Sequence, residues 1–426
     1  MLKALGAALL LLLAFIGLQS LLRDPPGASL RAFGDLEGTP SPGDAEFART
    51  LALMTQTDLS AGNQVQVLVN GDGTFPLLWR DMRSATRSLT VQSYYIAPGA
   101  TLDSLVTIMA ERARAGVRTH FLYDAFGGSI PDSALEFLAA SGVRSAAFRP
   151  IGWYTLHKAQ NRSHVRAITI DGVTGYTGGF GIDDKWLGNA ERDGRWRDTN
   201  VRFSGPAVSQ LQGAFDRAWV ETTGELLVGE TYFPTRPDSV PAGGMTAGFM
   251  HSPPTFGPTN SALLFALAVT GARRTIHISN SYFVPNQAMV DQLLSAAKRG
   301  VDVVLLLPGP LTDVPITRYA ARSHYDRMLR GGIRIYEYAP TMMHAKTFVI
   351  DGMFVSVGSA NLDHRSLALN DEGNLLVYDT GFGATMDSLF SADLTRSRAI
   401  TREVFAGRGL WDRLREAFAG GVGKLL

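Results

Sequence analysis

Two segments of this chain place a histidine, a cation and an aspartate at the same spacing. Residues 164–172 read HVRAITIDG, and residues 344–352 read HAKTFVIDG. The histidines are His164 and His344, the cations are Arg166 and Lys346, and the aspartates are Asp171 and Asp351. Residues two apart on a strand point to the same face of a sheet, so each imidazole and its cation can face one anion.

Two such segments meeting across a pseudo-twofold axis would surround one phosphate with two imidazoles and two cations. One imidazole can then attack phosphorus while the other protonates the leaving alkoxide, and the cations stabilise the charged oxygens. The motifs therefore predict phosphodiester transfer through a phosphohistidine. This chemistry requires no metal and no other cofactor.

The elements around the motifs are duplicated as well. The β-rich run at 88–95 (SLTVQSYY) matches the one at 274–283 (RTIHISNSYF), and AERARAGV at 110–117 matches LSAAKRGV at 294–301. Gly116 and Gly300 are expected to end their helices before the next strand starts. Strands that alternate with helices predict an α/β fold with a mixed, mostly parallel sheet in each half.

The length of 426 residues suits two domains of roughly 150–200 residues each. We predict a linker over 24–62, with one short helix around 44–55. Two pseudo-symmetric lobes follow, at 63–223 and 259–426. The Pro- and Gly-rich stretch 224–258 is expected to connect them.

The N-terminus, residues 1–23, carries an apolar run between Lys3 and Arg23. This run is just long enough to span a bilayer as a helix, which favours a single-pass anchor. A cleaved signal peptide is the alternative, although no convincing cleavage site follows the run. Charges flank the run almost evenly, so the side of the membrane that the enzyme faces stays open.

The composition excludes several other classes of site. The formal net charge is +1, and no basic stripe is evident, which disfavours a nucleic-acid partner. The chain has no cysteine, so disulfides and thiolate metal sites are excluded. We also see no His/Asp cluster at metal-ligand spacing, so no metal is expected.

With these motifs in place, the sequence resembles the phospholipase D superfamily and, within it, the bacterial cardiolipin synthases. The resemblance runs from about residue 63 to about residue 415. Its strongest part is HAKTFVIDGMFVSVGSANLDHRS at 344–366, followed by NDEGN at 370–374. The first motif is followed in the same way by WRDT at 196–199 and GPAV at 205–208.

The resemblance implies roles for individual residues. It implies His164 as nucleophile and His344 as general acid, although the pseudo-symmetry leaves the order open. Phosphate-binding positions fall on Lys346 and Asn361, with Ser359 beside them. An acidic residue after each histidine would orient its ring, which assigns Asp198 to His164 and Glu372 to His344. The motif aspartates, Asp171 and Asp351, are expected to be structural.

The first motif departs from the superfamily pattern at two places. Arg166 stands where lysine is usual, which keeps the charge but adds bulk near the phosphate. The turn at 178–181 reads GGFG and lacks the serine and asparagine of the second copy. The first half-site therefore differs more from the superfamily pattern than the second, and a catalytically weak lipid-binding pseudoenzyme is one alternative.

Taken together, these features predict a phosphatidyltransferase of the cardiolipin synthase type at the bacterial cell membrane. It would move a phosphatidyl group from phosphatidylglycerol to a second lipid alcohol. The expected partners are the phospholipid and the membrane, with no nucleic acid and an intramolecular pseudo-dimer. The alternatives are a phospholipase D that hydrolyses phospholipids and a nuclease of the same superfamily. A cleaved leader would make the protein periplasmic or secreted.

Overall fold

The computed structural model describes residues 11–12, 14–15, 38–152, 160–191, 194–235, 243–255 and 257–423. The first half contains β1 (Ser60–Val69), β2 (Ser88–Ser93), β3 (Arg118–Asp124), β4 (Arg144–Phe148), β5 (Ala167–Ile170), β6 (Thr174–Gly178) and β7 (Thr199–Ser204). Its helices are α2 (Ala45–Thr55), α3 (Asn70–Arg83), α4 (Ala100–Arg114), α5 (Asp132–Ala140) and α6 (Ala207–Thr223), with a 3₁₀ turn η3 (Asp184–Trp186). The short helix expected around 44–55 is confirmed as α2.

The second half repeats this series of elements. Its strands are β8 (Met245–Ser252), β9 (Thr275–Asn280), β10 (Asp302–Pro308), β11 (Arg334–Tyr338), β12 (Lys346–Ile350), β13 (Phe354–Gly358), β14 (Glu372–Tyr378) and β15 (Ser397–Ile400). Its helices are α7 (Asn260–Gly271), α8 (Gln287–Lys298), α9 (Pro315–Arg322), α10 (Tyr325–Arg330), α11 (Thr380–Thr395), α12 (Arg402–Ala406) and α13 (Leu410–Gly421), with a π-helical turn η4 (Arg365–Leu369).

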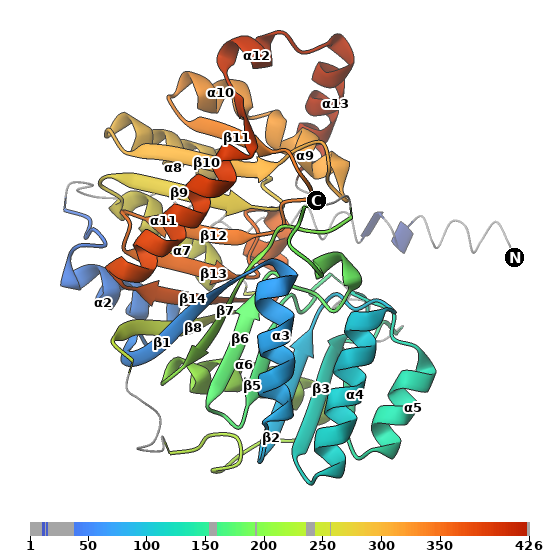
Figure 1. Ribbon diagram of the computed structural model, residues 1–426. Helices are drawn as coiled ribbons and strands as arrows, with labels where there is room; N and C mark the ends of the chain where they lie inside the picture. Colours follow the sequence, from blue (N-terminus) through green and yellow to red (C-terminus); the bar gives the residue numbers. More distant parts are fainter. Residues whose placement is uncertain are drawn as a thin grey trace, which may run out of the picture.

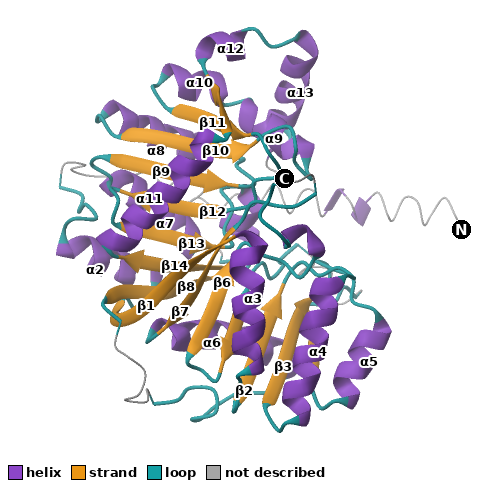
Figure 2. Ribbon diagram, viewed as in Figure 1, coloured by secondary structure: helices purple, strands orange, loops and turns teal. Residues whose placement is uncertain are grey.

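The described strands form one 15-stranded mixed sheet with helices on both faces (Figures 1 and 2). Its order is β15-β11-β10-β9-β12-β13-β14-β8-β1-β7-β6-β5-β2-β3-β4. The order outward from β8 matches the order outward from β1, except that β15 adds an edge strand. The mixed α/β fold is thus confirmed, with the two halves joined edge to edge through β1 and β8.

The prediction that the pairing is mostly parallel is wrong. Among the described strands, the pairs within β2-β3-β4 and β9-β10-β11 are parallel, and the other pairs are antiparallel. The Asp-Gly of each motif accounts for one antiparallel pair in each half, β5-β6 and β12-β13. Asp171 and Gly172 have φ of 55° and 68°, and Asp351 and Gly352 have 53° and 68°. Asp-Gly in this left-handed conformation makes a hairpin turn, so each motif strand folds back on the next.

The structure also bears on the helix-ending glycines and on the stretch between the two lobes. Gly116 and Gly300 follow α4 and α8 with φ of 87° and 89°, as expected for helix-ending glycines. The stretch 224–258, predicted to connect the two lobes, also contains β8 in the middle of the sheet. Its sequence MTAGFMHS, set among prolines, lacks the β-branched alternation that identifies a strand.

The predicted N-terminal anchor lies outside the described residues, apart from residues 11–12 and 14–15. Within the part of the chain that the structure describes, no helix combines the length and apolar character needed to cross a bilayer.

Candidate active site

The segments that carry the two histidines are hydrogen-bonded to the opposite half of the chain. The N–H of His164 donates to the carbonyl of Asp371 at 2.8 Å, and the N–H of His344 donates to the carbonyl of Arg197 at 2.7 Å. Each histidine lies just before its own strand, β5 or β12, and is held by a loop from the other half. This reciprocal exchange brings both histidines to the junction between the halves.

The carboxylates that hold the imidazoles are exchanged in the same way. Nδ1 of His164 lies 3.0 Å from Oε2 of Glu372, and Nδ1 of His344 lies 2.9 Å from Oδ2 of Asp198. The predicted assignment of Asp198 to His164 and of Glu372 to His344 is therefore wrong. The loops that precede β7 and β14 cross the junction, so each acid reaches the histidine of the other half.

These contacts define which ring nitrogen is available for chemistry. A carboxylate on Nδ1 retains the proton there, so Nε2 is left unprotonated in the neutral ring. Nζ of Lys346 lies 3.0 Å from Nε2 and 3.1 Å from Nδ1 of His344, so it contacts the imidazole without selecting one of its nitrogens. With the proton on Nδ1, each imidazole would present Nε2 as the nitrogen that a nucleophile or a proton acceptor uses.

The two cations are buried and are held by similar backbone contacts. Nζ of Lys346 donates to the carbonyl of His344 at 2.8 Å, and Nη1 of Arg166 donates to the carbonyl of His164. Nε of Arg166 also donates to the carbonyl of Phe180 at 3.1 Å. Each cation is thereby fixed beside the histidine two residues before it, although both histidines and Arg166 lie just before β5 and β12 rather than within them.

Electrostatics indicate that the four groups form one cluster. Burial, followed by Arg166 and Lys346, lowers the pKa of His164 well below its usual value. Burial and Lys346 lower the pKa of His344 to about 4, and Arg166 contributes as well. Each imidazole therefore senses the cation of the other half. A bound anion would offset this positive field and make either ring easier to protonate.

The two carboxylates differ in their pKa. Burial raises the pKa of Glu372 to about 7. Burial also acts to raise the pKa of Asp198, but the bond to His344 and the nearby Lys346 outweigh it and leave that pKa below its usual value. Asp198 is therefore the firmly ionised member of the two, and Glu372 can take up a proton near neutral pH.

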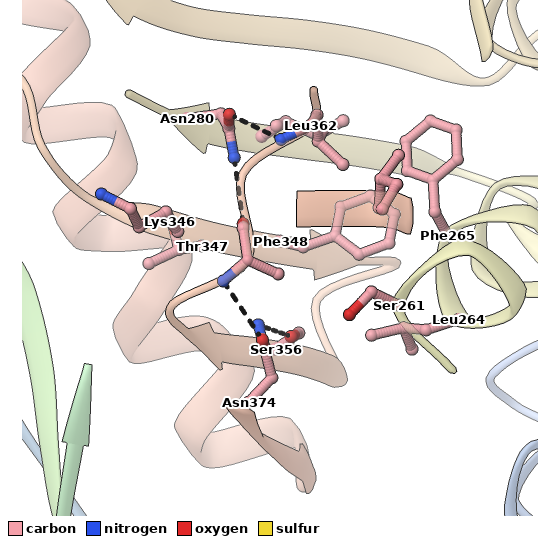
Figure 3. Close-up of a pocket in the computed structure, with 13 residues that line it drawn as sticks. Ser261, Leu264, Phe265, Asn280, Lys346, Thr347, Phe348, Ser356, Leu362 and Asn374 are labelled. Carbon is pink, nitrogen blue, oxygen red and sulfur yellow. Dashed lines mark hydrogen bonds between the residues drawn. The ribbon is translucent and has the colours of Figure 1, made fainter. Parts of the chain in front are cut away.

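An apolar cavity lies behind Lys346, between β12 and α7 (Figure 3). Its walls include Leu264, Phe265, Phe348 and Leu362. Figure 3 shows the amine of Lys346 pointing away from Leu264 and Phe265. Burial of the amine, together with the nearby Arg166, lowers the pKa of Lys346 to about 7. A lysine with this pKa regains its full charge when an anion binds next to it.

The predicted phosphate-binding residues of the second half lie in the same region. The hydroxyl of Ser359 donates to Glu372, and the N–H of Gly373 donates to that hydroxyl at 2.9 Å. Oδ1 of Asn361 accepts a hydrogen bond from Ser281 at 2.8 Å. In this structure Ser359 thus supports the carboxylate that holds His164, and Asn361 lies buried two residues further along the turn.

Asp171 and Asp351 lie at the far ends of β5 and β12, away from the histidines. The carboxylate of Asp171 accepts N–H groups from residues 86–88, and that of Asp351 accepts N–H groups from residues 273–275. Each aspartate ties its hairpin turn to the start of β2 or β9. The geometry is that of a structural residue.

Sequence reasoning overlooked two tryptophan contacts at His344. Nε1 of Trp186 donates to Oδ2 of Asp198 at 2.8 Å. The rings of Trp186 and Trp196 lie 5.1 and 4.9 Å from that of His344. The 180-residue offset between the motifs aligns Trp186 with Ser366 of the second motif. Comparison of the two copies could therefore have identified position 186 as part of the site.

The arrangement suits a phosphate better than a metal. Arg166 and Lys346 offer hydrogen-bond donors beside two imidazoles, and phosphate oxygens accept such bonds. Within the described residues, no group of three or more His, Asp or Glu side chains is placed to hold a metal ion.

Comparisons with known proteins agree with this geometry. Residues 267–394 match a family model described as "Cardiolipin synthase, PLD-like domain". Cardiolipin synthase A of Pseudomonas fluorescens is 34% identical over 348 residues, covering 80% of this chain and 71% of that protein. Cardiolipin synthase of Geobacillus kaustophilus is 34% identical over 374 residues, covering 87% of this chain and 74% of that protein.

Solved structures show the same fold at low sequence identity. Phosphatidylserine synthase of Haemophilus influenzae superposes with a TM-score of 0.67 at 11% identity, covering 89% of this chain and 98% of that chain. Polyphosphate kinase of Porphyromonas gingivalis gives a TM-score of 0.55 at 11% identity, covering 85% of this chain and 54% of that chain. Since the curated relatives exceed 30% identity over most of both chains, this chain belongs to the cardiolipin synthase family of the phospholipase D superfamily.

Proposed function

We propose that this enzyme transfers a phosphatidyl group from phosphatidylglycerol to the hydroxyl of a second lipid through a phosphohistidine. The observation that carries the proposal is the pair of buried imidazoles at the junction. Each is bonded through Nδ1 to a carboxylate of the other half, and each lies beside a buried cation. The names of the relatives point to the same substrate class.

In the first step, Nε2 of one imidazole attacks phosphorus and the P–O bond to the glycerol headgroup breaks. The other imidazole, protonated once the anionic phosphate has entered, gives its proton to the leaving alkoxide. Arg166 and Lys346 stabilise the charge on the phosphoryl oxygens. Following the superfamily pattern, we assign the attack to His164 and the proton transfer to His344.

In the second step, the hydroxyl of the acceptor lipid attacks phosphorus and the P–N bond breaks. The second imidazole, now neutral, accepts the proton of that hydroxyl. Ser359 and Asn361 complete the phosphate site in this proposal. If water took the place of the lipid, the product would be phosphatidic acid and the enzyme a phospholipase D.

The proposal includes an arrangement of the whole chain. Residues 63–223 and 259–426 act as two lobes that form an intramolecular pseudo-dimer, with the reactive phosphorus between them. Residues 1–23 anchor the enzyme in the bacterial cell membrane. The repeat of the strand order on either side of β8 and β1 supports the pairing of lobes.

The test is to incubate the purified protein with labelled phosphatidylglycerol and to identify the products. Cardiolipin and glycerol are expected, with full activity in chelator. His164→Ala and His344→Ala should abolish turnover. His277→Ala is the matched control, because His277 is held by Asp387 at 2.7 Å and stacks on Phe390 of α11, outside the cluster. Turnover that survives in either of the first two variants would rule out the two-histidine scheme, and phosphatidic acid alone would identify a hydrolase.

A further inference from the structure

The last long helix of the described chain, α13, exposes its apolar side chains. Leu410, Trp411, Leu414 and Phe418 are 71%, 74%, 50% and 67% exposed. At about 100° per residue, these four positions fall within an arc of about 100°, so they form one stripe along the helix. A surface helix normally turns such a stripe toward the core, and isolated exposed apolar residues would not line up in this way.

The opposite side of α13 is polar or small, and it is fixed to the protein. Glu416 is buried between two arginines, accepting from Nε of Arg322 at 2.8 Å and from Nε of Arg408 at 2.6 Å. Ala419 packs with Ala320 of α9 and with Val284. Rotating the helix to hide the stripe would break this buried ion-pair network. The exposed stripe is therefore a fixed feature of the fold.

Cations lie along both flanks of the stripe. Arg413 falls on one side of the apolar arc and Arg415 on the other, at about 100° per residue. Their guanidinium groups are held by the carbonyl of Ala406 at 2.8 Å and by the hydroxyl of Tyr319 at 3.2 Å. An apolar stripe that carries tryptophan and is edged by arginines is typical of a helix lying in a membrane interface.

The helix α13, which carries the stripe, lies at the same end of the strands as the histidines, and this end of the sheet is its catalytic edge. α13 packs on α9, which follows the carboxyl end of β10 (Figure 1). The N–H of Val284, which Ala419 contacts, donates to the carbonyl of Leu362, next to Asn361 in the active-site turn. Three further exposed apolar side chains follow carboxyl ends of strands on this edge: Phe126 after β3, Ile151 after β4 and Leu311 after β10.

We propose that the α13 stripe is a membrane-docking surface that turns the catalytic edge of the sheet toward an anionic bilayer. The inference rests on the proposed function, because the substrate then lies in that bilayer. A second copy of the chain fits the stripe less well. Two stripes packed together would bring Arg413 and Arg415 of one helix against those of the other, and like charges in contact repel.

The chain contains no cysteine, so a single introduced thiol can be labelled without background. Leu414→Cys carrying an environment-sensitive fluorophore is compared with the same label at Leu53→Cys. Leu53 is 72% exposed on α2, on the opposite side of the molecule from α13 (Figure 1). Vesicles containing phosphatidylglycerol should shift the emission at 414 to the blue and leave that at 53 unchanged. The label reports on α13 itself, whatever residues 1–23 do.

Equal responses at the two sites would overturn the inference, as would a shift at 414 that follows protein concentration in the absence of lipid. A second arm measures activity. Trp411→Ser/Phe418→Ser should reduce phosphatidyl transfer on vesicles by at least about tenfold, because two large apolar contacts are lost. Transfer of a short-chain phosphatidylglycerol below its micelle concentration should not change. Equal activity on vesicles would also overturn the inference, whereas inactivity of the parent on both substrates would overturn the proposed function instead.

Discussion

The two half-sites hold the carboxylates that contact their histidines by different means. In the second half, Ser359 donates to Glu372, which holds His164. In the first half, the equivalent position is Gly179, and the indole of Trp186 donates to Asp198 instead. A Cβ on Gly179 would lie 2.4 Å from Oδ1 of Asp198, so the glycine makes room for the carboxylate. The GGFG turn is thus an alternative support for His344 and gives no reason to regard the first copy as degenerate.

Arg166 is a second position where the first half uses a different residue and still holds its histidine. The superfamily lysine is replaced by a guanidinium that bonds to the carbonyls of His164 and Phe180. Lys346 makes the corresponding contact with the carbonyl of His344 through a single amine. Arg166 is therefore built into the first half-site as firmly as Lys346 is into the second. The comparison teaches that sequence differences between copies can preserve the position of the histidines.

The largest expected effect tests whether both halves take part in one reaction or only one of them is catalytic. His164→Ala and His344→Ala should each lower kcat by at least about 10⁴-fold, because the imidazoles act as a unit. Steady-state assays with phosphatidylglycerol measure this loss. A strong effect in one variant and a mild effect in the other would show that the halves do not share one reaction.

The crossed acids are the next test. Asp198→Asn and Glu372→Gln should each lower kcat by about 10³–10⁴-fold, since each removes the carboxylate that fixes a tautomer. The ¹⁵N resonances of His344 should move in Asp198→Asn, and those of His164 in Glu372→Gln. The opposite pattern would contradict the exchange of acids between halves.

Replacing one of the two cations tests the role of Arg166. Arg166→Met should lower kcat by about 10²–10³-fold through loss of charge at the phosphate. Arg166→Lys should remain within about tenfold of the parent, because the amine retains that charge. An unchanged rate in Arg166→Met would favour the pseudoenzyme reading of the first half-site.

Substitutions at the equivalent turn positions, Gly179 and Ser359, should lower the free energy of unfolding by a smaller amount. The cause is overpacking in the first half and a lost hydrogen bond in the second. Gly179→Ser should displace Asp198 and cost about 1–3 kcal/mol of folding free energy through overpacking. Ser359→Gly should cost about 1 kcal/mol through one lost hydrogen bond. Denaturant unfolding measures both values. Equal stability in Gly179→Ser and the parent would mean that Asp198 is not packed against this turn.

A separate test concerns the pH dependence of stability. The pKa of Glu372 is about 7 in the folded protein and 4.5 ordinarily, so the folded state binds more protons in that range. Stability contributed by this group is complete at low pH and is lost as the pH rises toward about 7. Glu372→Gln lacks the titrating proton, so its Tm relative to the parent should rise by a few degrees across this window. A Tm difference that does not change with pH would contradict the raised pKa.

Much of the site followed from the sequence because it is encoded locally. The histidines, cations and motif aspartates lie within nine-residue segments, and the spacing within each segment sets the histidine beside its cation and the aspartate at the far end of the strand. The same local logic located β2, β3, β9 and β10. Asp-Gly was also a local signal, but it was taken only as part of the motif, so the antiparallel hairpins were missed.

The crossed acids are different because no local rule fixes them. Asp198 and His344 are separated by 146 positions, and Glu372 and His164 by 208. Which acid meets which ring depends on loops that cross the junction, and this is a property of the assembled sheet. The sequence did not predict β8 for a related reason: its strand conformation is imposed by pairing with β1 and β14 on either side.

The most direct test of the shared phosphorus uses a phosphodiester lipid with a p-nitrophenyl leaving group, which departs without a proton. His164→Ala and His344→Ala are each quenched with denaturant within one turnover, and the peptides are examined by mass spectrometry. One variant should accumulate a phosphatidyl adduct on its remaining histidine, with one p-nitrophenol released per chain, and the other should form none. Adducts in neither variant, or an adduct on any residue other than His164 or His344, would contradict the account.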